Sequence, residues 1–267
     1  MAVTEKKMLF FDIDGTLITD DGRRLLPDST RTAIKMARDK GHMTFINTGR
    51  VLINVEEFIR SPGFDGYVCG CGTYINVDGN ELLHHKISHD RCYEIAIKAR
   101  ECGMMSIFEY AFHTAYDKEM PQDGNKEILD YFKQMGRKMI DDIESSDFVF
   151  DKFTTWYNDG NIRVDEFIEY LSDDFHCIKR EGNFYEIVPK GYSKATGIRF
   201  LQDYYNIPLD NIYVFGDSNN DLDMLRYASN SIAMGVCTPE VAKVATYRTD
   251  TVENDGIMKA MKHLGVI

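Results

Sequence analysis

A short apolar run, Met8 to Ile13, most constrains what this chain can fold into. The run lacks the polar alternation of a half-exposed strand, so it predicts a strand that is buried on both faces of a parallel sheet. Asp28 to Lys40 has helical spacing and is followed by Gly41, and His42 to Ile46 is a second apolar strand. Strand, helix and strand in this order predict a right-handed parallel α/β arrangement.

The pattern continues with a helix over roughly Leu52 to Arg60 and a third strand at Gly66 to Cys69. Tyr74 to Val77 and Glu81 to Ile87 then flank Asp78-Gly79, a dipeptide that is typical of a tight hairpin turn. We therefore expect antiparallel structure to begin here and the first fold unit to be complete near residue 80.

The middle of the chain differs in texture from both ends, because short helices and strands mix there without the regular order of a parallel sheet. The expected helices are His89 to Cys102, Lys126 to Met135 and Val164 to Leu171, and the expected strands are Met105 to Glu109, Thr154 to Tyr157, His176 to Arg180 and Phe184 to Val188. From Ser193 the α/β pattern returns and continues to about His263. The simplest organisation is a core formed by residues 1–81 and 187–267, interrupted by an α+β insert of residues 82–186.

The charge balance excludes several classes of partner. The chain has 31 Lys plus Arg against 43 Asp plus Glu, a net charge of −12, which is the wrong sign for a protein that neutralises nucleic-acid phosphates. Anionic membrane surfaces are disfavoured for the same reason, and no apolar stretch approaches the length of a membrane span or a signal-peptide core. The six cysteines include no C-x-x-C pair. We therefore expect a cytoplasmic protein with reduced thiols, a monomer or weak dimer that binds neither nucleic acid nor membrane.

The first chemical motif places Asp12 and Asp14 two residues apart at the end of the first strand, followed by Gly15 and Thr16. Alternate positions share a side, and ligands of parallel sheets bind at the carboxyl ends of the strands, so both acids would face a site. The alternative is a simple turn in which Asp-Gly serves only backbone geometry.

A second motif, Gly216 to Asp221, again follows a buried strand and precedes a helix. Asp, Ser and Asn are also preferred at helix starts, so a capped helix is the alternative. A cap uses one side chain, however, and Asp217 and Asp221 together suit oxygen ligation of a hard cation such as Mg²⁺.

Two weaker signals complete the set. Thr48-Gly49-Arg50 ends the second strand, where a hydroxyl and free backbone amides can hold an anion. Lys194 lies in the first turn of a helix, where the dipole disfavours a cation unless an anion is nearby; an exposed surface lysine is the alternative.

These four segments converge on the same edge of one sheet. Asp12, Asp14, Asp217 and Asp221 would bring up to four negative charges into one cleft, which requires a divalent cation, a lysine and one carboxyl that stays protonated. A phosphoryl-transfer site has those elements.

With these motifs the chain resembles the haloacid dehalogenase-like superfamily, in its Cof-type branch of sugar-phosphatase-like hydrolases. The family's D-x-D-G-T corresponds to Asp12 to Thr16, its hydroxyl motif to Thr48, its lysine to Lys194 and its G-D-x-x-N-D to Gly216 to Asp221. The resemblance implies a Rossmann-like parallel-sheet core with an inserted α+β cap domain. One departure is Cys71-Gly72, where relatives usually carry Asn-Gly.

The resemblance also implies a role for each residue. Asp12 would be the nucleophile that takes the phosphoryl group, and Asp14 would protonate the leaving alcohol and then activate water. Mg²⁺ would lie on Asp12, the Asp14 carbonyl and Asp217, with Asp221 in support. The expected substrate-binding residues are Thr48, Gly49, Arg50, Lys194 and Asn220.

The function expected from this is Mg²⁺-dependent hydrolysis of small phosphorylated metabolites. A phosphomutase or phosphotransferase of the phosphomannomutase-like type is an alternative, and a catalytically silent binding module is another. No Walker A sequence or complete dinucleotide-binding glycine motif is present. Arg180, Asn183 and Tyr185 are nominated for specificity, while His84, His85 and His89 are expected on a solvated hairpin surface rather than on a metal.

Overall fold

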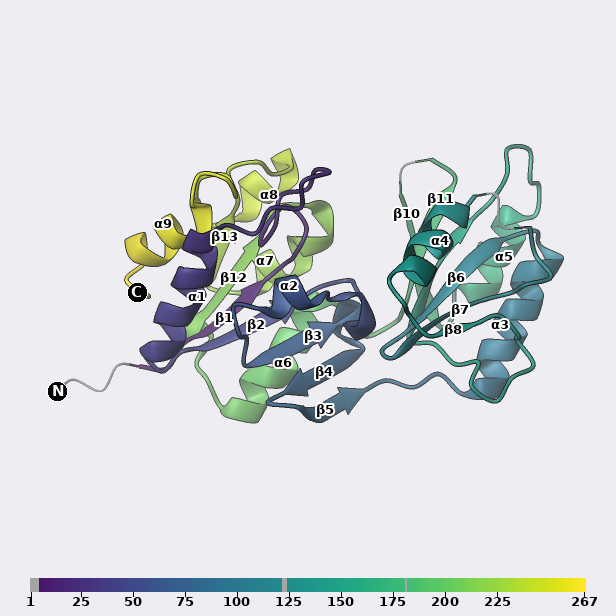
Figure 1. The fold of residues 1–267 in the computed structure, drawn as a ribbon, viewed down its shortest axis with the longest axis horizontal. Coiled ribbons are helices and arrows are strands. Elements are labelled where there is room, and N and C mark those ends of the chain that lie inside the picture. Colours follow the sequence, from purple (N-terminus) through teal and green to yellow (C-terminus); the bar gives the residue numbers. More distant parts are fainter. Residues whose placement is uncertain (1–4, 122–123, 181) are drawn as a thin grey trace. The chain divides into compact units, whose positions relative to one another are not determined.

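The computed structural model describes residues 5–121, 124–180 and 182–267. Its chain forms two compact units, which are described separately (Figure 1). Unit 1 comprises Met1–Arg50, Val55–Leu83 and Tyr192–Ile267, and unit 2 comprises Val51–Asn54 and His84–Gly191. The sequence-based boundaries differ from these by a few residues and leave Val51–Asn54 in the first unit.

Unit 1 is built on an eight-stranded sheet of order β14-β13-β12-β1-β2-β3-β4-β5. The strands are β1 (Met8–Phe11), β2 (Met43–Asn47), β3 (Gly66–Cys69), β4 (Tyr74–Val77), β5 (Asn80–His84), β12 (Ile212–Gly216), β13 (Asn230–Ala233) and β14 (Tyr247–Arg248). Pairing is parallel from β14 to β3, and the β4–β5 hairpin continues the sheet with β4 antiparallel to β3. This confirms the predicted parallel α/β core and the hairpin that was predicted around Asp78-Gly79.

Helices cover this sheet in layers. They are α1 (Asp28–Asp39), α2 (Glu57–Arg60), α6 (Lys194–Tyr205), α7 (Leu222–Tyr227), α8 (Pro239–Val244) and α9 (Gly256–His263), with short 3-10 turns at Gly70–Gly72, Leu209–Asn211 and Asn219–Asp221. Apolar residues of α6, α7 and α8 join Phe10, Phe45 and Val214 in one buried cluster. Helices α1 and α9 contact each other outside that cluster and form the other layer (Figure 1).

Unit 2 contains a six-stranded sheet of order β10-β11-β9-β6-β7-β8. Its elements are α3 (His89–Glu101), β6 (Met105–Tyr110), β7 (His113–Tyr116), α4 (Lys126–Gln134), β8 (Met139–Ile140), β9 (Lys152–Trp156), α5 (Val164–Leu171), β10 (Phe175–Lys179) and β11 (Phe184–Pro189). All pairs except β7–β8 are antiparallel. The insert is therefore an α+β unit, as predicted. The short strands β7 and β8 were not predicted from the sequence.

The two faces of the unit 2 sheet differ chemically. Phe108, Phe153 and Ile187 are aligned across β6, β9 and β11 and pack under α3 and α5 in an apolar core. Because side chains alternate along a strand, Lys152 and Glu186 lie on the opposite face. The second face thus carries charged residues.

The segment expected as one helix over Leu52 to Arg60 is broken, so that prediction is wrong. Leu52–Asn54 forms a 3-10 turn that belongs to unit 2, where the Ile53 amide donates to the Ala111 carbonyl at 3.0 Å. The chain returns to unit 1 at Val55, and α2 begins at Glu57. A contact distant in sequence therefore overrides the local helical pattern.

The predicted exposed histidine surface is also wrong for His84. Its side chain is only 2% exposed, and its Nε2 lies 2.8 Å from Oδ1 of the fully buried Asp151. The imidazole is also within 5.1 Å of the Tyr110 ring, centroid to centroid. The hairpin strand thus continues into a packed part of unit 2. His85 and His89 are half-buried. Among the described residues, no helix is long and apolar enough to span a membrane.

Candidate active site

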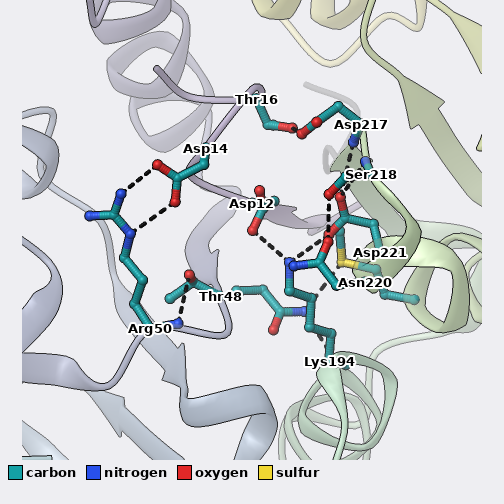
Figure 2. Close-up of polar contacts among 12 residues, drawn as sticks. Asp12, Asp14, Thr16, Thr48, Arg50, Lys194, Asp217, Ser218, Asn220 and Asp221 are labelled. Carbon is teal, nitrogen blue, oxygen red and sulfur yellow. Dashed lines mark hydrogen bonds and ion pairs between the residues drawn. The ribbon is translucent and has the colours of Figure 1, made fainter. Parts of the chain in front are cut away.

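A buried lysine links two carboxylates at the carboxyl edge of the unit 1 sheet (Figure 2). Lys194 Nζ lies 2.5 Å from Asp12 Oδ1 and 2.5 Å from Asp221 Oδ1. Lys194 is 2% exposed, so it is not the surface lysine that its local sequence alone allows. The structure thus brings together residues that are 182 positions apart in the chain.

The start of α6 fixes where Lys194 lies. Ser193 caps the helix by accepting from the Thr196 amide, and the Thr196 hydroxyl accepts in turn from the Ser193 amide. The loop after β3 approaches so closely that a Cβ on Gly72 would lie 2.4 Å from the Ser193 carbonyl oxygen. Gly72 also has φ +89°, so both the close approach and the backbone conformation favour glycine at this position.

The loop after β12 supplies the remaining acids. Asp221 Oδ2 accepts from the backbone amides of Asp217 at 2.9 Å and Ser218 at 3.1 Å, so this carboxylate shapes its own loop. Thr16 Oγ1 donates to Asp217 Oδ1 at 2.9 Å and ties the two acidic motifs together. Gly15 permits the close approach, because a Cβ there would lie 2.5 Å from an Asp217 carboxylate oxygen.

The electrostatics show an excess of negative charge. Burial raises the pKa of the Asp12 carboxyl to about 7, since it outweighs the lowering effect of Lys194, and Asp221 adds to the rise. Burial, Asp12 and Asp221 together raise the pKa of Asp217 to about 8. For Lys194, burial lowers the pKa, but Asp12 and Asp221 more than offset it and raise the pKa overall. The lysine remains charged, and it does not neutralise all three acids.

This donor set fits a hard divalent cation. Asp12, Asp217 and Asp221 offer oxygens that lie within 4.8 Å of one another. Both oxygens of Asp221 already accept hydrogen bonds, whereas Asp12 Oδ2 and Asp217 Oδ2 accept none from the described part of the chain. Asp12 and Asp217 are therefore the better direct ligands, and Asp221 is better suited to support.

The second aspartate of the first motif points away from this cluster (Figure 2). Arg50 forms a bidentate pair with Asp14, in which Nε donates to Oδ2 at 2.9 Å and Nη2 donates to Oδ1. The Asp14 side chain is 44% exposed, whereas Asp12 and Asp221 are buried and Asp217 is half-buried. The two aspartates thus face different surroundings, which suits different roles.

The anion-binding residues expected from sequence surround the same point. Buried Thr48 follows β2, and its Oγ1 accepts from the Arg50 amide at 3.1 Å. Gly49 lies between them, and Asn220 is exposed at the rim, where its Oδ1 accepts from Ser218 Oγ at 2.6 Å. Figure 2 shows Thr48, Lys194 and Asn220 around Asp12, an arrangement that can hold an anion beside a carboxylate.

Sequence reasoning missed two residues that support this site. Glu56 accepts from Arg50 Nη1 at 3.0 Å, and Arg24 forms two hydrogen bonds to the same glutamate at 2.7 and 2.8 Å. Neither residue falls in a motif or at helical spacing from its partner. Nothing short of the folded chain could have identified them.

The specificity residues nominated in unit 2 lie apart from one another. Arg180 pairs with Glu186, and Asn183 donates to Asp159 Oδ1 at 2.7 Å. Tyr185 packs against the apolar core under the helices, on the face opposite Glu186. They do not form one group.

Comparison with known proteins agrees with this geometry. Residues 9–261 match the family model of haloacid dehalogenase-like hydrolases. The chain belongs to this family. It is 25% identical to YkrA of Bacillus subtilis, over 98% of this chain and 99% of that one. It is 26% identical to the 5-amino-6-(5-phospho-D-ribitylamino)uracil phosphatase YcsE of Bacillus subtilis, over 96% and 95%.

Solved structures extend the comparison. The sugar phosphatase BT4131, of haloacid dehalogenase subclass IIB, is 28% identical with a TM-score of 0.78, covering 98% of this chain and 100% of that one. This haloacid dehalogenase-like chain is therefore a phosphatase, and a divalent cation is compatible with its aspartate cluster.

Proposed function

We propose that this protein hydrolyses small phosphorylated metabolites with Mg²⁺ and forms an aspartyl-phosphate on Asp12. The observation that carries this proposal is the buried Lys194 between Asp12 and Asp221, beside a third acid, Asp217. A carboxylate beside a buried lysine, at a site whose other acids suit a divalent cation, can attack a phosphoryl group.

The residues would share the reaction as follows. Lys194 and Thr48 hold phosphoryl oxygens, and Asp12 attacks phosphorus through a carboxylate oxygen as the ester oxygen departs. When bound to Asp12 and Asp217, Mg²⁺ would supply positive charge against the phosphoryl oxygens. An Asp14 that enters the step protonated would give its proton to the departing alcohol, and the resulting carboxylate would take one from the water that cleaves the aspartyl-phosphate.

The substrate class is proposed from the relatives and from the size of unit 2. YcsE and BT4131 are phosphatases of a ribitylaminouracil phosphate and of sugars, according to their names. We infer that unit 2 acts as a cap that restricts access to small esters, so a folded phosphoprotein should be a poor substrate. Dephosphorylation of folded phosphoproteins as fast as the best metabolite would contradict the cap.

A phosphate-release screen tests the activity. Sugar phosphates, nucleotides, flavin mononucleotide and pyridoxal phosphate are each offered with Mg²⁺ and after exhaustive chelation. We expect release only with the metal. Full activity after chelation would remove Mg²⁺ from the proposal, and turnover that depends on an added sugar bisphosphate would favour a phosphomutase.

The Asp14→Asn variant tests the mechanism. A nitrophenolate leaves without a proton whereas a sugar alkoxide does not, so this variant should release a burst of nitrophenolate approaching one equivalent per site and then turn over slowly. A sugar phosphate should give no comparable burst. Rapid steady turnover of both esters would show that Asp14 does not serve as acid and base.

A further inference from the structure

Asp14 is the end of a chain of ion pairs that reaches well beyond the catalytic motifs. Arg50 holds both oxygens of Asp14, Glu56 holds Arg50 at 3.0 Å, and Arg24 holds Glu56 through two hydrogen bonds. The Glu56 side chain is 8% exposed, against 23% for Arg50 and 44% for Asp14. Exposure of the side chains thus increases along these ion pairs from Glu56 to Asp14.

The backbone of Arg50 is fixed as well. Its amide donates to Thr48 Oγ1 at 3.1 Å, and its carbonyl accepts from the Gly70 amide at 2.8 Å. What remains adjustable is the long side chain, which has many rotamers and keeps one orientation only where partners hold it. Glu56 is one such partner, and it holds the guanidinium in the position from which Arg50 gives Asp14 two hydrogen bonds.

In the sequence, a short segment of unit 2 lies between Arg50 and Glu56. Val51–Asn54, which we call the strap, follows Arg50 directly and ends two residues before Glu56. In unit 2 the Ile53 amide donates to the Ala111 carbonyl at 3.0 Å, and Asn54 Nδ2 lies 3.5 Å from Glu109 Oε2. Arg50 is therefore the last residue of unit 1 before the strap, and Glu56 is the second residue after it.

We propose that Glu56 is a positioning residue that orients Asp14 through Arg50, and that the strap makes this orientation depend on unit 2. The inference rests on the proposed function, in which Asp14 is the acid for the leaving group. Glu56 accepts hydrogen bonds from Arg24 and Arg50, whereas Lys194 donates to Asp12 and Asp221. Its effect should therefore appear only in the step that uses Asp14.

Steady-state kinetics of Glu56→Gln with two esters test the positioning. The parameter kcat/KM reports the steps through phosphoryl transfer, in which a sugar phosphate needs the acid and p-nitrophenyl phosphate does not. We expect kcat/KM to fall by about tenfold to a hundredfold for the sugar phosphate and by less than about threefold for the nitrophenyl ester. Equal losses for both esters, or none for either, would overturn the proposal.

Asp65→Asn is the matched control. Asp65 is another partly buried carboxylate of unit 1, paired with Arg38 at 3.1 Å and accepting from the Thr44 amide at 2.7 Å. Its loss should lower the melting temperature without discriminating between the esters. If Asp65→Asn discriminated as strongly as Glu56→Gln, general loosening of the unit would explain both, and the positioning role would be lost.

Asn54→Ala tests the strap. It removes the contact with Glu109 but leaves the Ile53 hydrogen bond, so we expect the same selective fall, about threefold to tenfold. An unchanged ratio of the two kcat/KM values would overturn the part of the proposal that involves unit 2.

A readout without turnover separates this inference from the proposed function. In thermal unfolding, Glu56→Gln and Asp14→Asn should be non-additive, because they break the same chain, whereas Asp65→Asn and Asp14→Asn should add. If the effects of Glu56→Gln and Asp14→Asn are non-additive but the protein releases no phosphate, the positioning role stands and the proposed activity is refuted. If the effects are additive in a protein that is an active phosphatase, the activity stands and the positioning role is refuted.

Discussion

Each unit contains a buried lysine between two carboxylates, and only one of the two clusters has the charge excess of a catalytic site. In unit 1, Lys194 lies 2.5 Å from both Asp12 and Asp221. In unit 2, Lys152 lies 2.5 Å from Glu186 and 3.8 Å from Glu109. The two clusters differ in the further charged residue that each contains. In unit 1 this residue is a third acid, Asp217, whereas in unit 2 it is a second cation, Arg180, which pairs with Glu186.

The added residue decides the electrostatics. Burial alone would raise the pKa of Glu186, but Lys152 and Arg180 outweigh it and lower that pKa to about 2. In unit 1, burial and two neighbouring acids raise the pKa of Asp217 to about 8. A balanced buried cluster is complete by itself, whereas an acidic one requires a further cation. Charge balance, rather than the presence of a buried lysine, therefore distinguishes the candidate catalytic cluster from the cluster in unit 2.

The largest expected effect is that of Asp12→Asn. An amide cannot accept the phosphoryl group, so turnover should fall by at least about a thousandfold with the circular dichroism spectrum unchanged. Phosphate release from the best substrate measures this. Glu186→Gln, which changes a carboxylate of the balanced cluster in the same way, should retain hydrolysis of p-nitrophenyl phosphate. A near-normal rate for Asp12→Asn would exclude the covalent mechanism.

Asp217→Asn should come next, because it removes the acid that distinguishes the two clusters. Loss of one charged oxygen ligand should weaken Mg²⁺ binding by at least about tenfold. The dependence of activity on Mg²⁺ concentration measures it, and the rise in melting temperature caused by Mg²⁺ gives a second measure. The same Mg²⁺ titration in this variant and the wild type would show that Asp217 is not a ligand.

Lys152→Met should reveal a structural role in unit 2. This substitution removes the ammonium group that lies between the buried carboxylates of Glu109 and Glu186. It should lower the free energy of unfolding by ~3 to 5 kcal/mol, while Mg²⁺ affinity stays unchanged. Lys138→Met is the control, since that lysine forms an exposed pair with Asp147 at 3.0 Å and its loss should leave the free energy of unfolding almost unchanged. Similar losses in the two variants would mean that the Lys152 cluster is not a buried network.

The smallest effect is the pH dependence of Glu186. Its folded-state pKa of about 2 lies below the ordinary value of 4.5, so its stabilising contribution is present above pH 4.5 and is lost as the pH falls toward 2. The difference in free energy of unfolding between the wild type and Glu186→Gln should shrink over that window. Denaturant unfolding at a series of pH values checks this. A difference that grows with acidification would contradict the assigned ion pairs.

Much of the catalytic motif could be predicted from the sequence by itself. A strand that is apolar throughout has to be buried, and a parallel sheet binds ligands where its strands end, so Asp12, Thr48 and Asp217 were expected at one edge. The structure places them after β1, β2 and β12, which are neighbours in the sheet. Cys71 has a φ of 58°, in the left-handed region that Asn adopts more readily than most residues.

Only the tertiary structure decided which charges pair. From their local sequence, Lys194 could have been a surface lysine, His84 could have been an exposed histidine, and Leu52–Asn54 could have begun a helix. The neighbouring residues in the sequence exclude none of these alternatives. Local sequence fixes alternation, capping and turns, because those depend on neighbours in the chain. Burial of Lys194 between two acids, and the Glu56–Arg50–Asp14 chain, depend on the order of strands in the sheet and on contacts across many residues. The candidate catalytic residues could therefore be predicted from the sequence, whereas the residues that pair with them could not.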